Sequence, residues 1–130
     1  MAELNFPADL KYTQSHEWLR IEGDRATIGI TDYAQSELGD VVYIELPNAG
    51  LEIDPEVPFG TIESVKAVAD LFCPLRCKVV EVNHAVIDSP EIVNKSPYGD
   101  GWMIVVEVAD PSQFDTLLDA EAYKQLIGQG

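Results

Sequence analysis

The sequence has few positive charges. Lysine and arginine together number 8, against 23 aspartates and glutamates, and the formal net charge is −15. Nucleic acids and anionic membrane surfaces bind proteins through basic patches that neutralise phosphate, so we expect neither kind of partner. The charge instead favours solubility and attraction to proteins that present positive docking surfaces.

Residues that bind metals are scarce as well. The 2 cysteines, Cys73 and Cys77, are too few for a disulfide framework, and the 2 histidines, His16 and His84, are isolated in the sequence. A structural zinc site needs four such ligands at suitable spacings. We therefore expect no metal site, and we expect His16 to be a hydrogen-bonded structural residue.

Long apolar runs are absent too. No stretch approaches the roughly 20 apolar residues that cross a bilayer. The first residues have the pattern of neither a secretory signal nor an organellar transit segment. We expect a cytoplasmic bacterial protein, or a mitochondrial matrix protein whose leader has been removed. The 130 residues fit one domain, with a core over about 11–110 and a C-terminal helical segment over about 111–127, and we expect a monomer.

What the sequence does contain is a series of short apolar strands separated by turn residues. Strands are predicted at 17–21, 26–30, 40–47, 59–64, 67–74, 77–83 and 102–108. Many short strands with a few helices are typical of a β-sandwich or flattened barrel. The chain is therefore expected to be mostly β.

Capping residues predict the helices. Thr31 is expected to cap a helix over 32–38 that buries Ala34 and Leu38 and ends at Gly39. Ser89 is expected to cap a short helix that starts at Pro90.

The C-terminal region shows a second set of capping signals. Asp110 and Gln113 form a capping-box pattern, and Asp119 is expected to cap a second helix there. An apolar stripe at helical spacing is expected to pack on the core and comprises Phe114, Leu117, Leu118, Leu126 and Ile127.

Lys66 is the only basic residue between 26 and 75, in a span that carries nine acids. The predicted strands place it at the tip of a tight hairpin between Val65 and Ala67. A solubilising or edge-protecting lysine is the ordinary alternative. A Schiff-base lysine is disfavoured, because nearby carboxylates favour the charged ammonium. The isolated position and small apolar neighbours favour a lysine that is presented to other proteins or modified.

Long blocks around Lys66 resemble the H proteins of the glycine cleavage system. The resemblance runs from about residue 11 to 127 and rests on SHEWLRIEGDRATIGITDYAQ, SELGDVVYIELP, ESVKA, NKSPYGDGWMIVVEV and LLDAEAYK. It implies a mostly β, lipoyl-type fold, a flattened barrel or sandwich of two small antiparallel sheets with short helices and a C-terminal helix. It also implies that lipoic acid is joined to Lys66 by an amide bond.

The resemblance implies a carrier and not an enzyme. Such a carrier shuttles the aminomethyl group of glycine between a pyridoxal-phosphate glycine decarboxylase and a tetrahydrofolate-dependent aminomethyltransferase. A dihydrolipoamide dehydrogenase reoxidises it, and lipoate-attaching enzymes modify it. The alternative is a lipoyl domain or lipoate relay protein that serves a 2-oxoacid dehydrogenase complex. Biotin attachment is disfavoured, because Val65 and Ala67 stand where biotinyl domains typically carry methionine.

Matching the motifs residue by residue assigns candidate roles around the lysine. Ser15, Glu17 and Asp70 are implied to hold the amine end of the loaded arm, and no residue is expected to be catalytic. Glu63 is implied to be recognised by the lipoate-attaching enzymes. The alternative for each acid is a solvated surface charge.

One departure from the family pattern concerns the cysteines. The family usually has a small residue at Cys73 and a Ser-Gly turn where Arg76 and Cys77 stand. Either the turn is built differently here or Cys77 is strained. If residues 74–76 form a three-residue loop, the two cysteines face each other across it, and a disulfide is geometrically possible. We expect two free thiols.

Overall fold

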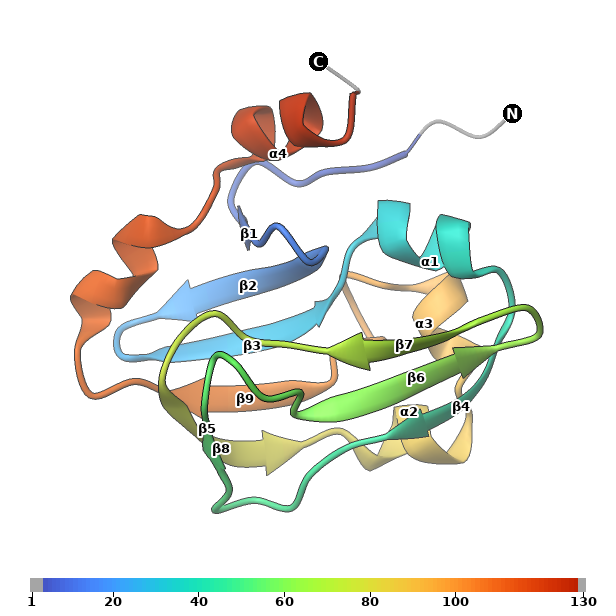
Figure 1. Ribbon diagram of the computed structural model, residues 1–130, viewed down its shortest axis with the longest axis horizontal. Coiled ribbons are helices and arrows are strands. Elements are labelled where there is room, and N and C mark those ends of the chain that lie inside the picture. Colours follow the sequence, from blue (N-terminus) through green and yellow to red (C-terminus); the bar gives the residue numbers. More distant parts are fainter. Residues whose placement is uncertain (1–3, 129–130) are drawn as a thin grey trace.

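The computed structural model describes residues 4–128, which form two antiparallel sheets and several short helices (Figure 1). The six-stranded sheet has the order β1-β2-β3-β9-β8-β5, and the three-stranded sheet has the order β4-β6-β7. The strands are β1 (Lys11–Tyr12), β2 (Glu17–Glu22), β3 (Arg25–Ile30), β4 (Val41–Glu45), β5 (Glu52–Ile53), β6 (Gly60–Ser64), β7 (Val68–Leu71), β8 (Cys77–Val82) and β9 (Ile104–Glu107). The helices are α1 (Asp32–Leu38), α2 (His84–Asp88), α3 (Ile92–Lys95), the 3₁₀ helix η1 (Pro111–Thr116) and α4 (Ala120–Leu126). The expected mostly β fold of two antiparallel sheets is confirmed.

The main core lies between the two sheets. Strands alternate inward apolar and outward polar residues, so Leu19 and Ile28 of the larger sheet meet Ile44, Ile62 and Leu71 of the smaller one. A second, smaller cluster joins the N-terminal segment to α4 through Phe6, Leu10, Tyr12, Trp18, Ala120 and Tyr123. This cluster secures the C-terminal helix beside the start of β2.

Several local predictions are confirmed by specific contacts. The β2–β3 hairpin turns at Gly23 with φ 66°, and Thr31 caps α1 by accepting a hydrogen bond from the backbone N–H of Ala34 at 3.1 Å. Asp119 caps α4 through the N–H of Ala122 at 2.8 Å. These signals depend on neighbours within four residues, which is why the sequence shows them.

Other local predictions are wrong. Residues 84–88 form the unpredicted helix α2, capped by Asn83, and Ser89 ends this helix instead of capping the next one. Asn83 also donates to the backbone oxygens of Asp100 and Trp102, and these long-range bonds are invisible in the local pattern. Ala34 and Leu38 do pack against the core as expected, but both are only half-buried.

The C-terminal region differs from the expectation in its capping box and at one residue of its apolar stripe. The capping box at 110–113 does not form, because the side chain of Gln113 bonds the backbone of Arg76 and leaves Asp110 to cap η1 alone. Four residues of the stripe pack on a core cluster as expected: Phe114, Leu117, Leu118 and Ile127. Leu126 is exposed instead, whereas Tyr123 is fully buried. Position in the tertiary fold, not helical spacing alone, decides which face of α4 is covered.

Candidate functional site

Lys66 lies at the tip of the β6–β7 hairpin, as expected. The backbone N–H of Ser64 donates to the oxygen of Ala67 at 2.8 Å, which closes a four-residue turn. The Ser64 hydroxyl oxygen accepts hydrogen bonds from the N–H groups of Lys66 and Ala67, at 3.3 and 3.1 Å. Serine at the first position of a tight turn commonly stabilises it in this way. The turn therefore fixes the backbone of Lys66 while leaving its side chain exposed.

The hairpin tip is held against the connection between α1 and β4. The N–H of Val65 donates to the oxygen of Asp40 at 3.0 Å, and the aliphatic stem of Lys66 passes beside Gly39. Gly39 has φ 78° and ψ −156°, a conformation that residues with a Cβ rarely adopt. Glycine is required here by the backbone, and it places α1 next to the lysine.

The side chain of Asn94 forms hydrogen bonds to the connection between α1 and β4. Its side-chain oxygen accepts from the N–H of Val41 at 2.8 Å, and its amide nitrogen donates to the backbone oxygen of Gly39 at 2.9 Å and to Gln35 at 3.0 Å. Asn94 has no local signature in the sequence, because its partners lie more than fifty residues away. Its position in the NKSPYGDGW block is the only signal that the sequence offered.

A pocket of about 280 Å³ lies between α1, β7 and the start of β2. Figure 1 shows α1 above the hairpin that carries β6 and β7. The lining combines apolar side chains with three acids and comprises Ser15, His16, Glu17, Ile30, Tyr33, Ala34, Glu37, Leu38, Ile62, Ala69, Asp70 and Leu71. The pocket therefore offers both apolar surface and negative charge beside the lysine hairpin.

Glu17 is the buried acid of this pocket, with only 2% of its surface exposed. Its Oε1 accepts hydrogen bonds from the hydroxyls of Thr13 and Ser15, both at 2.6 Å, and the backbone of Phe72 also bonds the carboxylate. None of the ion pairs among residues 4–128 includes Glu17. Burial outweighs these hydrogen bonds and raises the pKa of Glu17 to about 7. A cation placed close to this carboxyl would favour its charged form.

His16 forms a rigid part of the pocket wall. Its φ of 73° makes it the one residue other than glycine with a positive φ in the described part of the chain. Its Nδ1 lies 2.9 Å from the hydroxyl of Tyr123, which in turn lies 2.8 Å from the hydroxyl of Thr31. Burial lowers the pKa of His16, so its neutral form is favoured. His16 is thus hydrogen-bonded as expected, and no group of metal-ligating residues occurs within residues 4–128.

The structure brings together three of the residues that the sequence suggested and separates a fourth. Ser15, Glu17 and Asp70 all line the pocket. Glu63 lies outside it, opposite Tyr43 on β4 and Val68 on β7 in the strand register. Tyr33 and the apolar lining were not predicted as part of the site, and His16 was predicted only as a structural residue, because each is distinguished only by its place in the fold.

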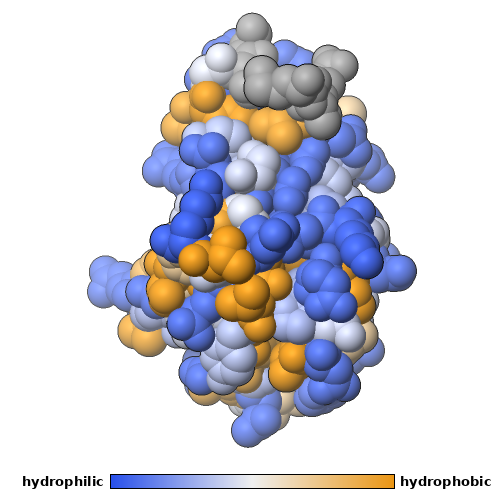
Figure 2. Space-filling model, turned by 90° about the vertical axis from the view of Figure 1, so that its right-hand side faces the viewer, coloured by the Kyte–Doolittle hydropathy of each residue, from blue (hydrophilic) through white to orange (hydrophobic). Residues whose placement is uncertain are grey.

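The hairpin presents apolar groups around the lysine. Val65 is 70% exposed and Val68 is 64% exposed, and Val42 and Tyr43 of the neighbouring strand β4 are also exposed. Figure 2 views the molecule from the side on which the hairpin tip lies, and apolar residues gather in the middle of this face among hydrophilic ones. Such a surface suits brief contact with other proteins.

Two facing antiparallel sheets, a single lysine at a hairpin tip and a carboxylate-lined pocket beside it define a carrier domain of the lipoyl type. The family model described as "Glycine cleavage H-protein" matches residues 10–130. The chain belongs to the glycine cleavage H-protein family.

Related proteins are similar in sequence to this chain over nearly its whole length. The glycine cleavage system H protein of Geobacillus sp. (strain WCH70) is 54% identical over 127 residues, which cover 98% of this chain and 100% of that protein. The H protein of Bacteroides thetaiotaomicron is 52% identical over 124 residues, covering 95% of this chain and 98% of that protein. A crystal structure of the H protein from Mycobacterium marinum has a TM-score of 0.86 and 36% identity, covering 95% of this chain and 99% of that one. The function that the resemblance implied, a carrier in the glycine cleavage system, is confirmed.

Proposed function

We propose that this protein carries the aminomethyl group of glycine on a lipoyl group joined by an amide bond to Lys66. The observation that carries this proposal is the hairpin lysine itself, exposed at a rigid turn beside a pocket with a buried carboxylate. Membership of the glycine cleavage H-protein family supports it.

The residues present fit such a modification. Lys66 takes part in none of the ion pairs among residues 4–128, so amide formation breaks no salt bridge. The turn around it is held by backbone and Ser64 contacts that do not involve its side chain. A bound lipoyl group supplies a dithiolane that accepts the aminomethyl group and the electrons released from glycine. The turn thus holds the attachment point still while the side chain moves freely.

In this proposal Ser15, Glu17 and Asp70 receive the amine of the cargo. An ammonium group close to Glu17 favours the carboxylate and lowers its pKa from the raised value. Thr13 and Ser15 keep the carboxylate oriented by donating to Oε1, so the cargo meets an acceptor that is already in place. The apolar lining from Ile30, Leu38 and Leu71 excludes water from the reactive carbon.

The carrier role assigns the chemistry to partner enzymes. We propose that this chain is non-catalytic and serves a pyridoxal-phosphate glycine decarboxylase, a tetrahydrofolate-dependent aminomethyltransferase and a dihydrolipoamide dehydrogenase. The net charge of −15 favours docking to positive surfaces on these enzymes. No helix within residues 4–128 is long and apolar enough to span a membrane. The cytoplasmic location stays a prediction, and the relatives compared come from bacteria.

Glu63 is proposed to contact the lipoate-attaching enzymes. It precedes Lys66 by three residues and faces away from the pocket, in register with Val68 and Tyr43. A Glu63→Ala variant should accept lipoate more slowly than the parent while folding normally. Attachment at the parent rate would leave Glu63 as a solubilising charge.

The proposal is tested by reconstituting glycine decarboxylation with purified partner enzymes. The lipoylated protein should support exchange of the glycine carboxyl group with bicarbonate, and Lys66→Arg should reduce the rate to that without carrier. Lys78→Arg, at an exposed position of β8, is the matched control and should retain the parent rate. Activity of the Lys66→Arg variant at the parent rate would refute the proposal.

A further inference from the structure

Cys73 and Cys77 form a pair of buried thiols outside the lysine site. Their Sγ atoms lie 3.8 Å apart, and neither is in a disulfide. Neither has a positive φ, so the alternative of a strained Cys77 is wrong and the turn is built differently from a Ser-Gly turn. The three residues between them form a bend that brings the two sulfurs face to face. The S–S distance in a disulfide is about 2.05 Å. The two sulfurs would therefore have to approach each other by less than about 2 Å.

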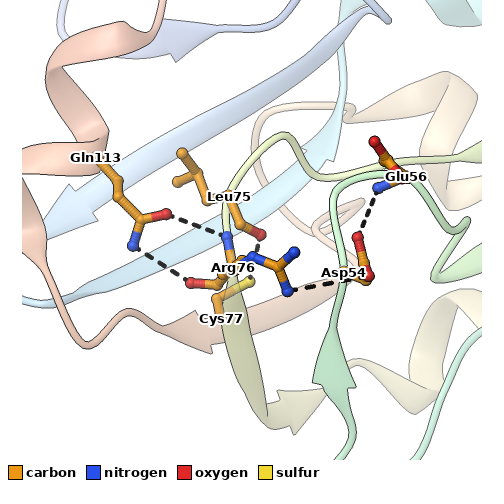
Figure 3. A network of polar contacts seen from close by, with 6 residues as sticks. All are labelled: Asp54, Glu56, Leu75, Arg76, Cys77 and Gln113. Carbon is orange, nitrogen blue, oxygen red and sulfur yellow. Dashed lines mark hydrogen bonds and ion pairs between the residues drawn. The ribbon is translucent and has the colours of Figure 1, made fainter.

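The bend between the cysteines is held by contacts from outside it (Figure 3). Gln113 accepts a hydrogen bond from the N–H of Arg76 at 3.2 Å and donates to its backbone oxygen at 3.5 Å. The guanidinium of Arg76 lies 3.9 Å from the carboxylate of Asp54, which accepts from the N–H of Glu56. These contacts attach Arg76, the residue that precedes Cys77, to segments outside the bend.

The two thiols differ in access and in acidity. Cys73 is 1% exposed, whereas Cys77 is 8% exposed and lines a surface cavity of about 350 Å³ with Arg76 and Lys78. The hydrogen bond with Cys77, and then burial, raise the pKa of the Cys73 thiol. The same contact lowers the pKa of Cys77. Thiolates, not thiols, attack oxidants. Cys77 is therefore the thiol that a small oxidant meets first.

We propose that Cys73 and Cys77 are a modification site, a dithiol that hydrogen peroxide converts into an intramolecular disulfide. The Cys77 sulfur attacks peroxide, the O–O bond breaks, and a sulfenic acid and water are formed. The Cys73 sulfur then attacks the Cys77 sulfur, the S–O bond breaks, and a second water leaves. Two thiols are oxidised and one peroxide is reduced to two waters. An added dithiol reduces the disulfide back to two thiols by thiol–disulfide exchange and is itself oxidised to a disulfide.

This pair is adjacent to the carrier pocket. Phe72, whose backbone bonds the carboxylate of Glu17, directly precedes Cys73, and Cys77 begins β8. A disulfide here ties the end of the lysine hairpin to the larger sheet. We therefore expect it to raise the melting temperature, because it constrains the unfolded chain.

The test uses the full chain with Lys66→Arg, so that Cys73 and Cys77 are the only thiols that can react. Brief treatment with hydrogen peroxide should remove both thiols together and lower the intact mass by two hydrogen atoms. Dithiothreitol should restore the parent mass, and the cross-linked peptide should contain residues 73 and 77. A dione probe should trap the sulfenic acid on Cys77 in a Cys73→Ala variant. The single thiol of a Cys77→Ala variant should react more slowly.

Two results would overturn the proposal. One is survival of both thiols at a peroxide concentration that consumes free glutathione. The other is addition of oxygen atoms, or formation of covalent dimers, without the intramolecular disulfide. Because the primary measurement uses both native cysteines, it does not depend on whether the alanine variants fold. Neither result bears on lipoate attachment at Lys66.

Discussion

The two ends of the carrier site, the hairpin tip with Lys66 and the pocket with Glu17, differ in burial and in charge. The tip is exposed and flanked by Val65 and Val68, whose side chains reach solvent. Glu17 is almost completely buried, and burial raises its pKa to about 7. One region keeps a cation accessible, and the other keeps a carboxyl away from water.

The difference follows from what each end must do in the proposed function. An attachment lysine must be reached by an enzyme, so it needs a rigid turn and an open surface. A site that protects a hydrolysable amine must exclude water and offer a fixed acceptor. Substitutions at the turn should therefore impair lipoate attachment, whereas substitutions in the pocket should shorten the lifetime of the loaded form.

The largest effect is expected at the buried acid. Glu17→Gln keeps an oxygen that accepts from Thr13 and Ser15 but removes the charge. A charge-assisted hydrogen bond contributes roughly 1.5–3 kcal/mol, so the variant's aminomethyl-loaded form should decay roughly 10- to 100-fold faster. Release of formaldehyde from the loaded protein measures the decay. Glu22→Gln, at the exposed end of the same strand, is the control and should leave it unchanged.

The same substitution, although it shortens the lifetime of the loaded form, should make the folded protein more stable at high pH. The pKa of Glu17 rises from 4.5 to about 7 on folding, so the folded state holds its proton more tightly. Wild-type stability should fall as pH rises from about 4.5 to about 7, by up to about 3 kcal/mol from this group. Urea unfolding should show that Glu17→Gln lacks this component and is the more stable protein above pH 7. A variant that is less stable than wild type at every pH would contradict the assignment.

An intermediate effect on stability and on lipoate attachment is expected at Gly39, which ends α1 and lies beside the stem of Lys66. Gly39→Ala forces a residue with a Cβ into a conformation that favours glycine, which should cost about 1–3 kcal/mol of unfolding free energy. The strain should also displace the hairpin tip and slow lipoate attachment. Gly23, on the remote β2–β3 turn, has a similar positive φ. The Gly23→Ala variant should therefore lose stability without slower lipoate attachment. Equal rates of lipoate attachment in both variants would show that Gly39 does not position the lysine hairpin.

The smallest effect is expected at the rim of the pocket. Asp70 is exposed on β7, where solvent weakens its attraction for an ammonium. Asp70→Asn should shorten the lifetime of the loaded form by a factor of only a few, from an exposed-pair energy of about 0.2–1 kcal/mol. If it shortened the lifetime more than Glu17→Gln does, the buried acid would not be the main acceptor.

The sequence predicted much of the tip and little of the pocket. The hairpin, Lys66 and the Thr31 cap depend on residues close together in the chain, so strand alternation and turn residues were enough. The pocket combines α1, β7 and the turn before β2, and its apolar lining has no local signature. Ser15, Glu17 and Asp70 were named through the family resemblance, and neither the burial of Glu17 nor its raised pKa was evident before the fold was known.

The errors have the same origin. Asn83, Asn94 and Gln113 are used in long-range hydrogen bonds to backbone groups, and each of these polar side chains is ambiguous when only its neighbours are considered. Helix α2 was missed because its cap, Asn83, ends an alternating valine-rich run. Polar side chains that bond distant backbone are the part of this fold that local pattern cannot supply.

The account rests on Lys66 as the point of lipoate attachment, and the mass of the modified protein tests this directly. After incubation with a lipoate-attaching enzyme, lipoate and ATP, the intact mass should rise by one lipoyl group, and the increase should map to the peptide that contains Lys66. The exposed lysines Lys11, Lys78 and Lys95 serve as internal controls and should stay unmodified. Attachment at another lysine, or an unchanged mass under conditions that modify an established H protein, would contradict the account.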